Sequence, residues 1–184
     1  MILYIIIAAV LLVNVINPRL LWYIDSWKYK SFQKEAPSSL YLFLCRLLSA
    51  LGLMILILVI YFQPMHLADL ADPKSELSIT RQHIYVENGE PEIDTESYND
   101  LSEDQTQRII DSLQQYTYRR TTGTLFSNGS LSDLGEWLIC IYIYRDNELV
   151  NTVIVSDTGD ISVNDRCYSM QDSQALIREI TEIL

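Results

Sequence analysis

The sequence predicts a membrane protein with an α+β domain. A two-helix transmembrane hairpin precedes a small extracytoplasmic domain, in which two amphipathic helices flank an antiparallel β-meander. Two long apolar runs fill most of the first 62 of 184 residues, and the rest shows strand-like and helix-like apolar spacing between turn residues. Residues 1–62 carry five Lys and Arg against two acidic residues, a net charge of +3, whereas residues 63–184 carry 8 against 22, a net charge of −14.

This composition excludes several classes of function. The apolar runs exclude a wholly soluble enzyme, and their small number excludes a channel or transporter with many spans. Nucleic acid is not expected as a partner, because the acidic domain would repel its phosphate backbone. The length suits one domain of ordinary size beside a membrane segment.

The first apolar run, residues 2–16, contains Asn14 as its only polar residue. Together with the apolar and aromatic residues beyond Pro18 it predicts a helix over about residues 2–23, close to the ~20 residues that a bilayer core requires. The alternative is a signal peptide. No basic residue precedes Arg19 and no small-x-small cleavage site is present, so a retained transmembrane helix is favoured.

The second apolar run covers residues 40–62 and contains Arg46 as its only charged residue. A helix of this length, at ~1.5 Å per residue, crosses a ~30 Å hydrocarbon core. Arg46 lies in its second turn, from which a long side chain reaches the lipid headgroups. We interpret the two helices as an anchor in the lipid bilayer and not as a transport pathway.

The basic residues predict the orientation of this anchor. Four of them lie in residues 17–39, between the two apolar runs, whereas only Lys74 follows within about 15 residues of Phe62. Short basic loops remain in the cytoplasm. We therefore expect a multi-pass protein of the cell membrane, with the linker 24–39 cytoplasmic and both termini outside.

A set of residues in and around this linker forms a recognisable pattern. It combines an Asn-Pro pair, linker aromatic and basic residues, and an arginine in the second helix: Asn17, Pro18, Trp22, Trp27, Lys28, Glu35, Pro37 and Arg46. The pattern resembles an uncharacterised bacterial family of two-helix membrane proteins, over residues 1–62 only. Ala36 departs from the family's Glu-Pro pairing, and Gly52 alone represents the glycines expected after the arginine.

The resemblance implies a two-helix membrane segment and carries no activity. The family's label has a loose link to natural-product biosynthesis. If these residues contact a partner, we expect that contact in the linker, between Trp22 and Ser38.

Residues 63–73, bounded by prolines, are predicted to be a connector, and residues 74–184 the acidic extracytoplasmic domain. Residues 78–86 have the β-branched and aromatic composition of a strand. An Asn-Gly turn follows them, and then a predicted acidic loop over residues 90–100.

The next elements are a helix and a strand. Ser102 and Gln105 match a capping box, and the apolar residues after them repeat at helical spacing, which predicts a helix that ends near Gln115. Residues 116–124 predict a strand, and residues 126–135 a loop rich in Ser, Asn and Gly.

The C-terminal part predicts the meander. Residues 137–144 alternate so that Trp137 and three isoleucines share one face, which favours a central strand. Asp172 can cap a final amphipathic helix. Turn residues at 146–147, 157–160 and 164–165 separate three further strands, predicted over residues 149–156, 161–163 and 167–170.

Asp157-Thr158-Gly159 matches the loop of aspartic proteases, in which two aspartates share one proton. However, the tripeptide lies between two predicted strands, where these residue types are common in turns, and the domain has too few strands for that fold. We therefore interpret it as a turn.

Oxygen ligands for Ca²⁺ are also present, at Asp157, Asp160, Asn164 and Asp165. Their spacing differs from that of the EF-hand loop, and they belong to two adjoining turns. Solvated turn residues are therefore the favoured interpretation of these four side chains.

The cysteines and histidines suggest little chemistry. Cys45 lies in the membrane segment, whereas Cys140 and Cys167 lie on predicted outer strands and can form a disulfide only if their Cα atoms approach within ~7 Å. Neither His66 nor His83 has a ligand partner at metal-site spacing. The sequence thus predicts no catalytic residue, cofactor or metal.

The function expected from these features is not enzymatic. The protein is expected to present a small extracytoplasmic domain that binds or scaffolds a protein partner in the membrane or envelope. The alternative is an accessory subunit of a membrane enzyme or export system, in natural-product biosynthesis if the family label applies.

Overall fold

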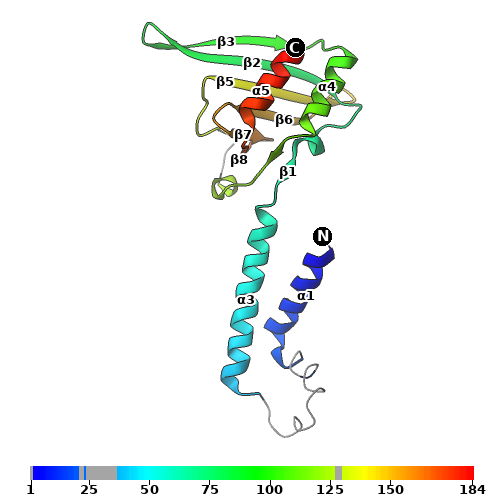
Figure 1. Cartoon of the computed structure of the whole chain (residues 1–184), viewed down its shortest axis with the longest axis vertical. Helices are drawn as coiled ribbons and strands as arrows, with labels where there is room; N and C mark the ends of the chain where they lie inside the picture. The colour runs from blue at the N-terminus through cyan, green and yellow to red at the C-terminus, as the bar shows by residue number, and fades with distance from the viewer. Residues whose placement is uncertain (1, 21–22, 24–36, 127–129) are drawn as a thin grey trace. The chain divides into compact units, whose positions relative to one another are not determined.

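The computed structural model of the protein describes residues 2–20, 23, 37–126 and 130–184 (Figure 1). The chain divides into two compact units, Met1–Tyr61 and Phe62–Leu184. This division falls where the net charge changes sign along the chain.

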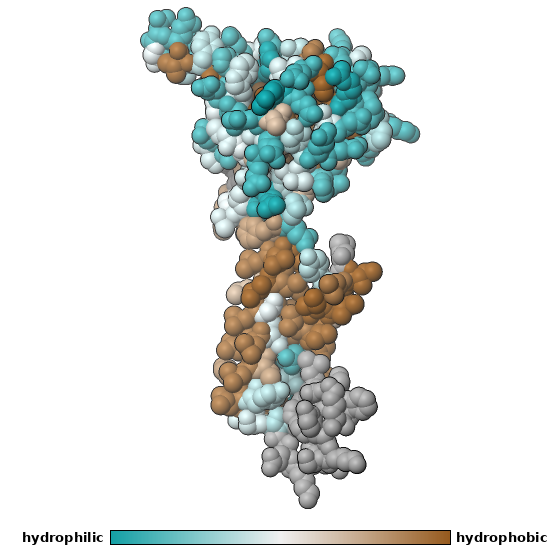
Figure 2. Space-filling model, viewed as in Figure 1, coloured by the Kyte–Doolittle hydropathy of each residue, from teal (hydrophilic) through white to brown (hydrophobic). Residues whose placement is uncertain are grey.

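The first unit contains two apolar helices, α1 (Ile2–Ile16) and α3 (Ser39–Tyr61). Their large side chains are mostly exposed, and Figure 2 shows this surface as predominantly hydrophobic. Within the described residues, α3 is the helix that is long and apolar enough to cross a membrane. It agrees with the helix predicted over residues 40–62.

The first helix is shorter than predicted. α1 ends at Ile16, and Asn17 is not helical, although the described residues beyond it are helical again. The interruption has a local cause, because Pro18 disfavours the helical conformation of the residue before it. The continuous helix expected over residues 2–23 is therefore broken at this point.

α1 and α3 pack against each other through small and polar residues. The Asn14 amide Nδ2 donates a hydrogen bond of 2.6 Å to Ser49 Oγ, and Ser49 is 4% exposed. Gly52 presents no side chain, so Leu11 packs close to the backbone of α3. Ser49 and Gly52 of α3 thus face α1.

The second unit is built on one antiparallel sheet of six strands in the order β3-β2-β5-β6-β7-β8. The predicted meander is present, and two further strands extend it. The strands are β2 (Glu76–Glu87), β3 (Glu90–Tyr98), β5 (Trp137–Arg145), β6 (Glu148–Ser156), β7 (Asp160–Val163) and β8 (Arg166–Ser169).

Two helices, α4 (Glu103–Leu113) and α5 (Ser173–Ile183), lie side by side over one face of this sheet (Figure 1). The predicted capping box begins α4: Gln105 N donates to Ser102 Oγ, and Ser102 N donates to Gln105 Oε1. Asp172 occupies the N-cap position of α5, but its side chain makes no capping hydrogen bond.

The core lies between the helices and the sheet. Ile139, Ile141 and Ile143 of β5 are at most 1% exposed, and β5 lies inside the sheet, as predicted for a central strand. Each such side chain contributes about 1.5–3 kcal/mol through burial. The helices supply the opposite layer of the core, with Ile109, Ile110 and Leu113 from α4 and Leu176, Ile177, Ile180 and Ile183 from α5.

The predicted hairpin turns are confirmed by their backbone angles. Consecutive residues with positive φ occur at Asn88-Gly89 (54° and 88°), Asp146-Asn147 (52° and 63°) and Asn164-Asp165 (48° and 60°). Such pairs fit two-residue turns whose twist matches that of the flanking strands, and Asn, Asp and Gly tolerate this conformation best.

One predicted loop is a strand. Residues 90–100 were expected to form an acidic loop, but β3 pairs with β2 along its whole length, from Glu90 to Tyr98. Acidic residues alternate with uncharged ones along this edge strand, so Glu92, Asp94 and Glu96 remain in contact with water. Because the alternating residues are acidic and mostly polar, the segment lacks the alternation of apolar and polar residues that normally indicates a strand.

A predicted strand is also largely replaced. Of residues 116–124, only β4 (Thr117–Tyr118) is a strand, and it is followed by a short 3-10 helix, η3 (Thr122–Leu125). The Thr121 amide donates to Thr124 Oγ1 at 2.8 Å, which is a local alternative to strand pairing.

The segment expected as a connector, residues 63–73, is folded into the second unit. It contains β1 (Met65–His66), which pairs with β4, and a 3-10 helix η2 (Leu67–Leu70). Leu67 is 1% exposed in the hydrophobic core. The folded domain therefore begins before residue 74.

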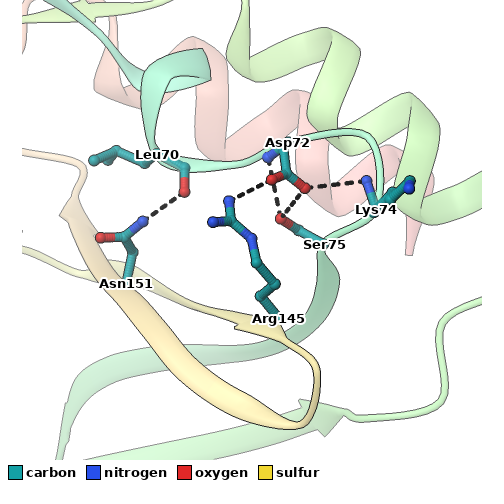
Figure 3. A network of polar contacts seen from close by, with 6 residues as sticks. All are labelled: Leu70, Asp72, Lys74, Ser75, Arg145 and Asn151. Atoms are coloured by element: carbon teal, nitrogen blue, oxygen red, sulfur yellow. Dashed lines mark hydrogen bonds and ion pairs between the residues drawn. The ribbon is translucent and has the colours of Figure 1, made fainter.

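Polar contacts fix this segment to the β5–β6 hairpin (Figure 3). Asn151 Nδ2 donates to the Leu70 carbonyl oxygen at 2.6 Å, and Arg145 pairs with the Asp72 carboxylate. The same carboxylate accepts hydrogen bonds from Lys74 N and Ser75 Oγ, both at 3.2 Å. The entry segment is thus bound to the sheet at several points.

Candidate functional site: a cleft beside helix α5

The helix-covered face of the sheet changes character along β2. Leu77 and Ile79 on this face are buried, whereas Arg81, His83 and Tyr85, which follow at the same period of two, are only half-buried. β2 and β3 extend beyond the helices at this end (Figure 1). The sheet therefore presents a polar and aromatic surface next to the core.

Trp137 is the centre of this surface. It pairs with His83 across β2 and β5, and the two rings stack with centroids 4.0 Å apart. His83 also stacks on Tyr85 at 5.3 Å, and the Arg81 guanidinium lies 5.4 Å from the Trp137 ring centroid. Stacking and cation–π contacts of this kind hold the indole in one orientation.

Two residues of β3 position Arg81. Its Nη2 atom lies 2.6 Å from Glu96 Oε2, which also accepts a 2.8 Å hydrogen bond from the Tyr98 hydroxyl. The Tyr98 hydrogen bond and the Arg81 charge lower the pKa of the Glu96 carboxyl, and the bond to Glu96 raises the pKa of Tyr98. Both groups therefore keep the protonation states that hold Arg81 beside the indole.

The flank of α5 forms the other wall of a cleft of about 460 Å³. This volume lies within the ~300–1,000 Å³ range of small-molecule sites. The cleft combines an aromatic ring, two guanidinium groups, two carboxylates and an amide, which suits a ligand with both apolar and charged groups. Its lining residues are Arg81, Trp137, Asp157, Gln174, Ile177, Arg178, Thr181 and Glu182.

A tyrosine fixes the other side of α5. The Tyr116 hydroxyl donates a 2.8 Å hydrogen bond to Glu179 Oε2. Burial, and then this bond to Glu179, raise the pKa of Tyr116 to about 12. The helix that carries the cleft wall is thus also held by a polar contact to the start of β4.

The Asp157-Thr158-Gly159 turn has structural contacts that explain each of its residues. Asp157 Oδ1 accepts a hydrogen bond from Glu136 N at 3.2 Å, and Thr158 Oγ1 donates to the Asp133 carbonyl oxygen at 3.2 Å. Gly159 has φ of +99°, and a Cβ there would lie 2.9 Å from the Met170 carbonyl oxygen. The tripeptide therefore fastens the turn to the preceding loop, in agreement with its interpretation as a turn.

The four candidate calcium ligands are not brought together. Asp157 and Asp160 lie at one end of β7, whereas Asn164 and Asp165 lie at the other. Asp160 Oδ2 accepts hydrogen bonds from Ser132 N and Asp133 N, and Asn164 Oδ1 accepts one from Thr152 N. Across the described residues, no group of three or more His, Cys, Asp or Glu is placed to hold a metal ion.

None of Cys45, Cys140 and Cys167, all within the described residues, is paired in a disulfide. Cys140 of β5 and Cys167 of β8 stand in one row across the sheet, but Ile154 and Ser162 lie between them. Three strand spacings of ~4.8 Å separate their backbones by ~14 Å, too far for a disulfide. Burial raises the pKa of the Cys140 thiol, which keeps it protonated.

The structure describes half of the motif residues predicted in the membrane segment. Asn17 Oδ1 accepts a hydrogen bond from Arg19 N, Pro18 is buried, and Arg46 is exposed on α3. Pro37 precedes α3 and is half-buried. The remaining members, Trp22, Trp27, Lys28 and Glu35, lie outside the described residues.

Two glycines with positive φ allow a matched test of the loop that contacts the Asp157 turn. Gly135 (φ +67°) would place a Cβ in overlap with Asp157 Oδ1 and 2.9 Å from Thr158 Cγ2, whereas Gly89 (φ +88°) has open space around it. Both Gly→Ala changes incur a conformational cost of about 1–2 kcal/mol.

We expect Gly135→Ala to lower the free energy of unfolding by about 2 kcal/mol more than Gly89→Ala does, because the overlap with Asp157 adds to the backbone cost. Urea unfolding of both variants measures the difference. Equal losses at the two positions would contradict the described contact between the loop and the Asp157 turn.

Comparison with known proteins gives one match. No curated protein and no solved structure matches the chain significantly. The match found covers the first unit, and its description assigns no activity and no link to natural-product biosynthesis. It confirms the resemblance predicted for the N-terminal segment: residues 3–63 match a family of unknown function, DUF6199.

Proposed function

We propose that this protein is a membrane-anchored binding protein, in which a transmembrane hairpin holds an extracytoplasmic domain that binds a protein partner through the Trp137 cleft. The observation that carries this proposal is the cleft itself. It combines a fixed indole ring with charges of both signs, and it opens beside a well-packed core. Buried aromatic anchors surrounded by polar groups are typical of the energetic centre of protein interfaces.

Three features support the anchor. α3 has 23 residues, or about 35 Å at ~1.5 Å per residue. Large apolar side chains of α1 and α3 are exposed to the surroundings, as in helices that face lipid. The Asn14–Ser49 hydrogen bond satisfies polar groups that would otherwise be unpaired in hydrocarbon.

The bias of basic residues supports the orientation of the anchor. A linker rich in Lys and Arg favours the cytoplasm, which leaves the N-terminus and the acidic domain outside a multi-pass membrane protein. The partner would then be another protein of the membrane or envelope, and an acidic domain favours a partner with a basic surface.

A second function is favoured by the extent of the family match. The match covers residues 3–63 and ends near the start of the outer domain, which favours a shared role for the membrane segment. In this alternative the protein is an accessory subunit of a membrane enzyme or export system. The contact would lie in residues 22–38.

One experiment separates the two proposals. A photo-crosslinking amino acid is placed in the full-length protein, in native membranes, at Thr181 in the cleft or at Val150, an exposed position on the β5–β6 hairpin. We expect an adduct from Thr181 and none from Val150. Trp137→Ala should reduce the adduct at least tenfold, whereas Tyr144→Ala, on the opposite face of β5, should leave it unchanged.

The opposite outcomes are equally specific. If Trp137→Ala retains the adduct and combined substitution of Trp27, Lys28 and Pro37 abolishes it, the contact lies in the membrane segment. If neither variant changes the adduct, or if Val150 crosslinks as strongly as Thr181, the proposed cleft interface is wrong.

A further inference from the structure

An exposed apolar pair lies at the end of η3. Phe126 is 89% exposed, the highest value for a large apolar side chain in the described residues, and Leu125 is 67% exposed. The pair belongs to a domain with a net charge of −14, and it is more exposed than the adjacent apolar pair Leu149 (52%) and Val150 (43%). Adjacent apolar side chains that are exposed to water are typical of surfaces that contact a membrane or another protein.

The segment that precedes this pair is held by hydrogen bonds. Thr124 is 5% exposed, and its hydroxyl accepts a hydrogen bond from Thr121 N. Arg119 N donates to the Ser169 carbonyl oxygen at 2.8 Å, and Ser169 N donates back to Arg119 O at 2.9 Å. The segment is therefore fixed to the edge of the sheet. The exposure of Leu125 and Phe126 follows from the fold of the domain.

The pair lies at the end of the domain where the chain enters. β4 pairs with β1, and η3 begins four residues after β4. Figure 1 shows β1 and the yellow-green coil of η3 at the same end of the domain. Only Phe62, Gln63 and Pro64 separate α3 from β1, which limits the distance between Tyr61 and Met65 to about 14 Å.

The sequence around the pair favours a lipid surface. No acidic residue occurs between Asp111 and Asp133, the longest such interval in residues 63–184. Arg119 and Arg120 lie within it, directly before η3, and Arg119 is exposed. Basic residues beside exposed Phe and Leu are the composition with which proteins contact anionic membrane surfaces.

We infer that Leu125 and Phe126 insert into the headgroup region of the bilayer, with the exposed Arg119 against anionic lipid headgroups. This inference rests on the proposed anchor, because α3 must hold the entry end of the domain near the membrane. The second contact would restrict the rotation of the outer domain about the three-residue joint. It would thereby set the direction in which the Trp137 cleft faces.

Fluorescence quenching in vesicles tests this inference with the full-length protein. The native cysteines are replaced, and single cysteines at Phe126, at Val86 on the β2–β3 hairpin or at Met54 on α3 carry an environment-sensitive dye. The vesicles contain equal parts of phosphatidylcholine and phosphatidylglycerol, with a fraction of spin-labelled lipid as quencher. Thermal unfolding confirms that each labelled protein is folded.

We expect strong quenching at Met54 and at least threefold more quenching at Phe126 than at Val86, a site that is also highly exposed (73%). Quenching at Met54 with no more at Phe126 than at Val86 would overturn the inference and leave the anchor intact. The absence of quenching at both Met54 and Phe126 would overturn the anchor, and the lipid contact with it.

Discussion

A membrane-impermeant thiol reagent added to intact cells is expected to label Glu87→Cys completely and Ser31→Cys not at all, in a protein without native cysteines. Glu87 lies on the exposed β2–β3 hairpin, and Ser31 belongs to the basic linker. The reason is the asymmetry of positive charge, since four basic residues lie between the apolar runs and only Lys74 follows closely after the second. The acidic residues of the outer domain contribute little to this rule.

Permeabilised cells provide the control, because both cysteines should then react to the same extent. The reverse labelling pattern would place the outer domain in the cytoplasm and would contradict the proposed orientation. It would also change the class of partner, from envelope proteins to cytosolic ones. Equal labelling of both sites in intact cells would contradict a membrane-spanning hairpin of either orientation.

Local chemistry explains why much of the second unit, residues 62–184, could be predicted. The turns at Asn88-Gly89 and Asp146-Asn147 need residues that accept positive φ, and few residue types do so. The capping box of Ser102 and Gln105 likewise satisfies backbone donors within four residues. Each of these signals is complete within a short stretch of sequence, so no knowledge of distant contacts is required.

The sequence-based predictions are wrong where contacts between residues distant in the sequence determine the structure. β3 is stabilised by pairing with β2, and its acidic edge gives no apolar alternation from which a strand could be recognised. Leu67 has a burial partner only because β1 pairs with β4, more than fifty residues later in the sequence. A short segment bounded by prolines therefore resembled a connector.

The candidate cleft could not be predicted for the same reason. Arg81, Trp137 and Arg178 come from two strands and a helix that are distant in the sequence. The signal that was available is the change along one face of β2, from Leu77 and Ile79 to Arg81 and His83. That change indicates where the core ends, but the register that pairs His83 with Trp137 is needed to identify a site.

Removal of the entry segment, residues 63–73, is expected to destabilise the second unit strongly. A fragment of residues 62–184 should unfold cooperatively, whereas a fragment of residues 74–184 should be several kcal/mol less stable or unfolded. The shorter fragment lacks Leu67, the β1 strand that pairs with β4, and the Asp72 partner of Arg145. The ion pair is half exposed and contributes at most about 1 kcal/mol, so the buried leucine should dominate the loss.

Leu67→Ala in the longer fragment isolates that contribution. This substitution should lower the free energy of unfolding by about 3 kcal/mol, near the middle of the range for a buried leucine that leaves a cavity. Leu149→Ala, at a position that is 52% exposed, should lower it by less than about 0.5 kcal/mol. Urea unfolding measures both values, and the slope of the unfolding free energy against urea concentration should be unchanged in both variants. If Leu67→Ala were as mild as Leu149→Ala, residues 63–73 would be a connector after all, and the joint to α3 would be longer and looser than three residues. A large loss instead means that the folded domain begins directly at this short joint, which the proposed lipid contact of Leu125 and Phe126 requires.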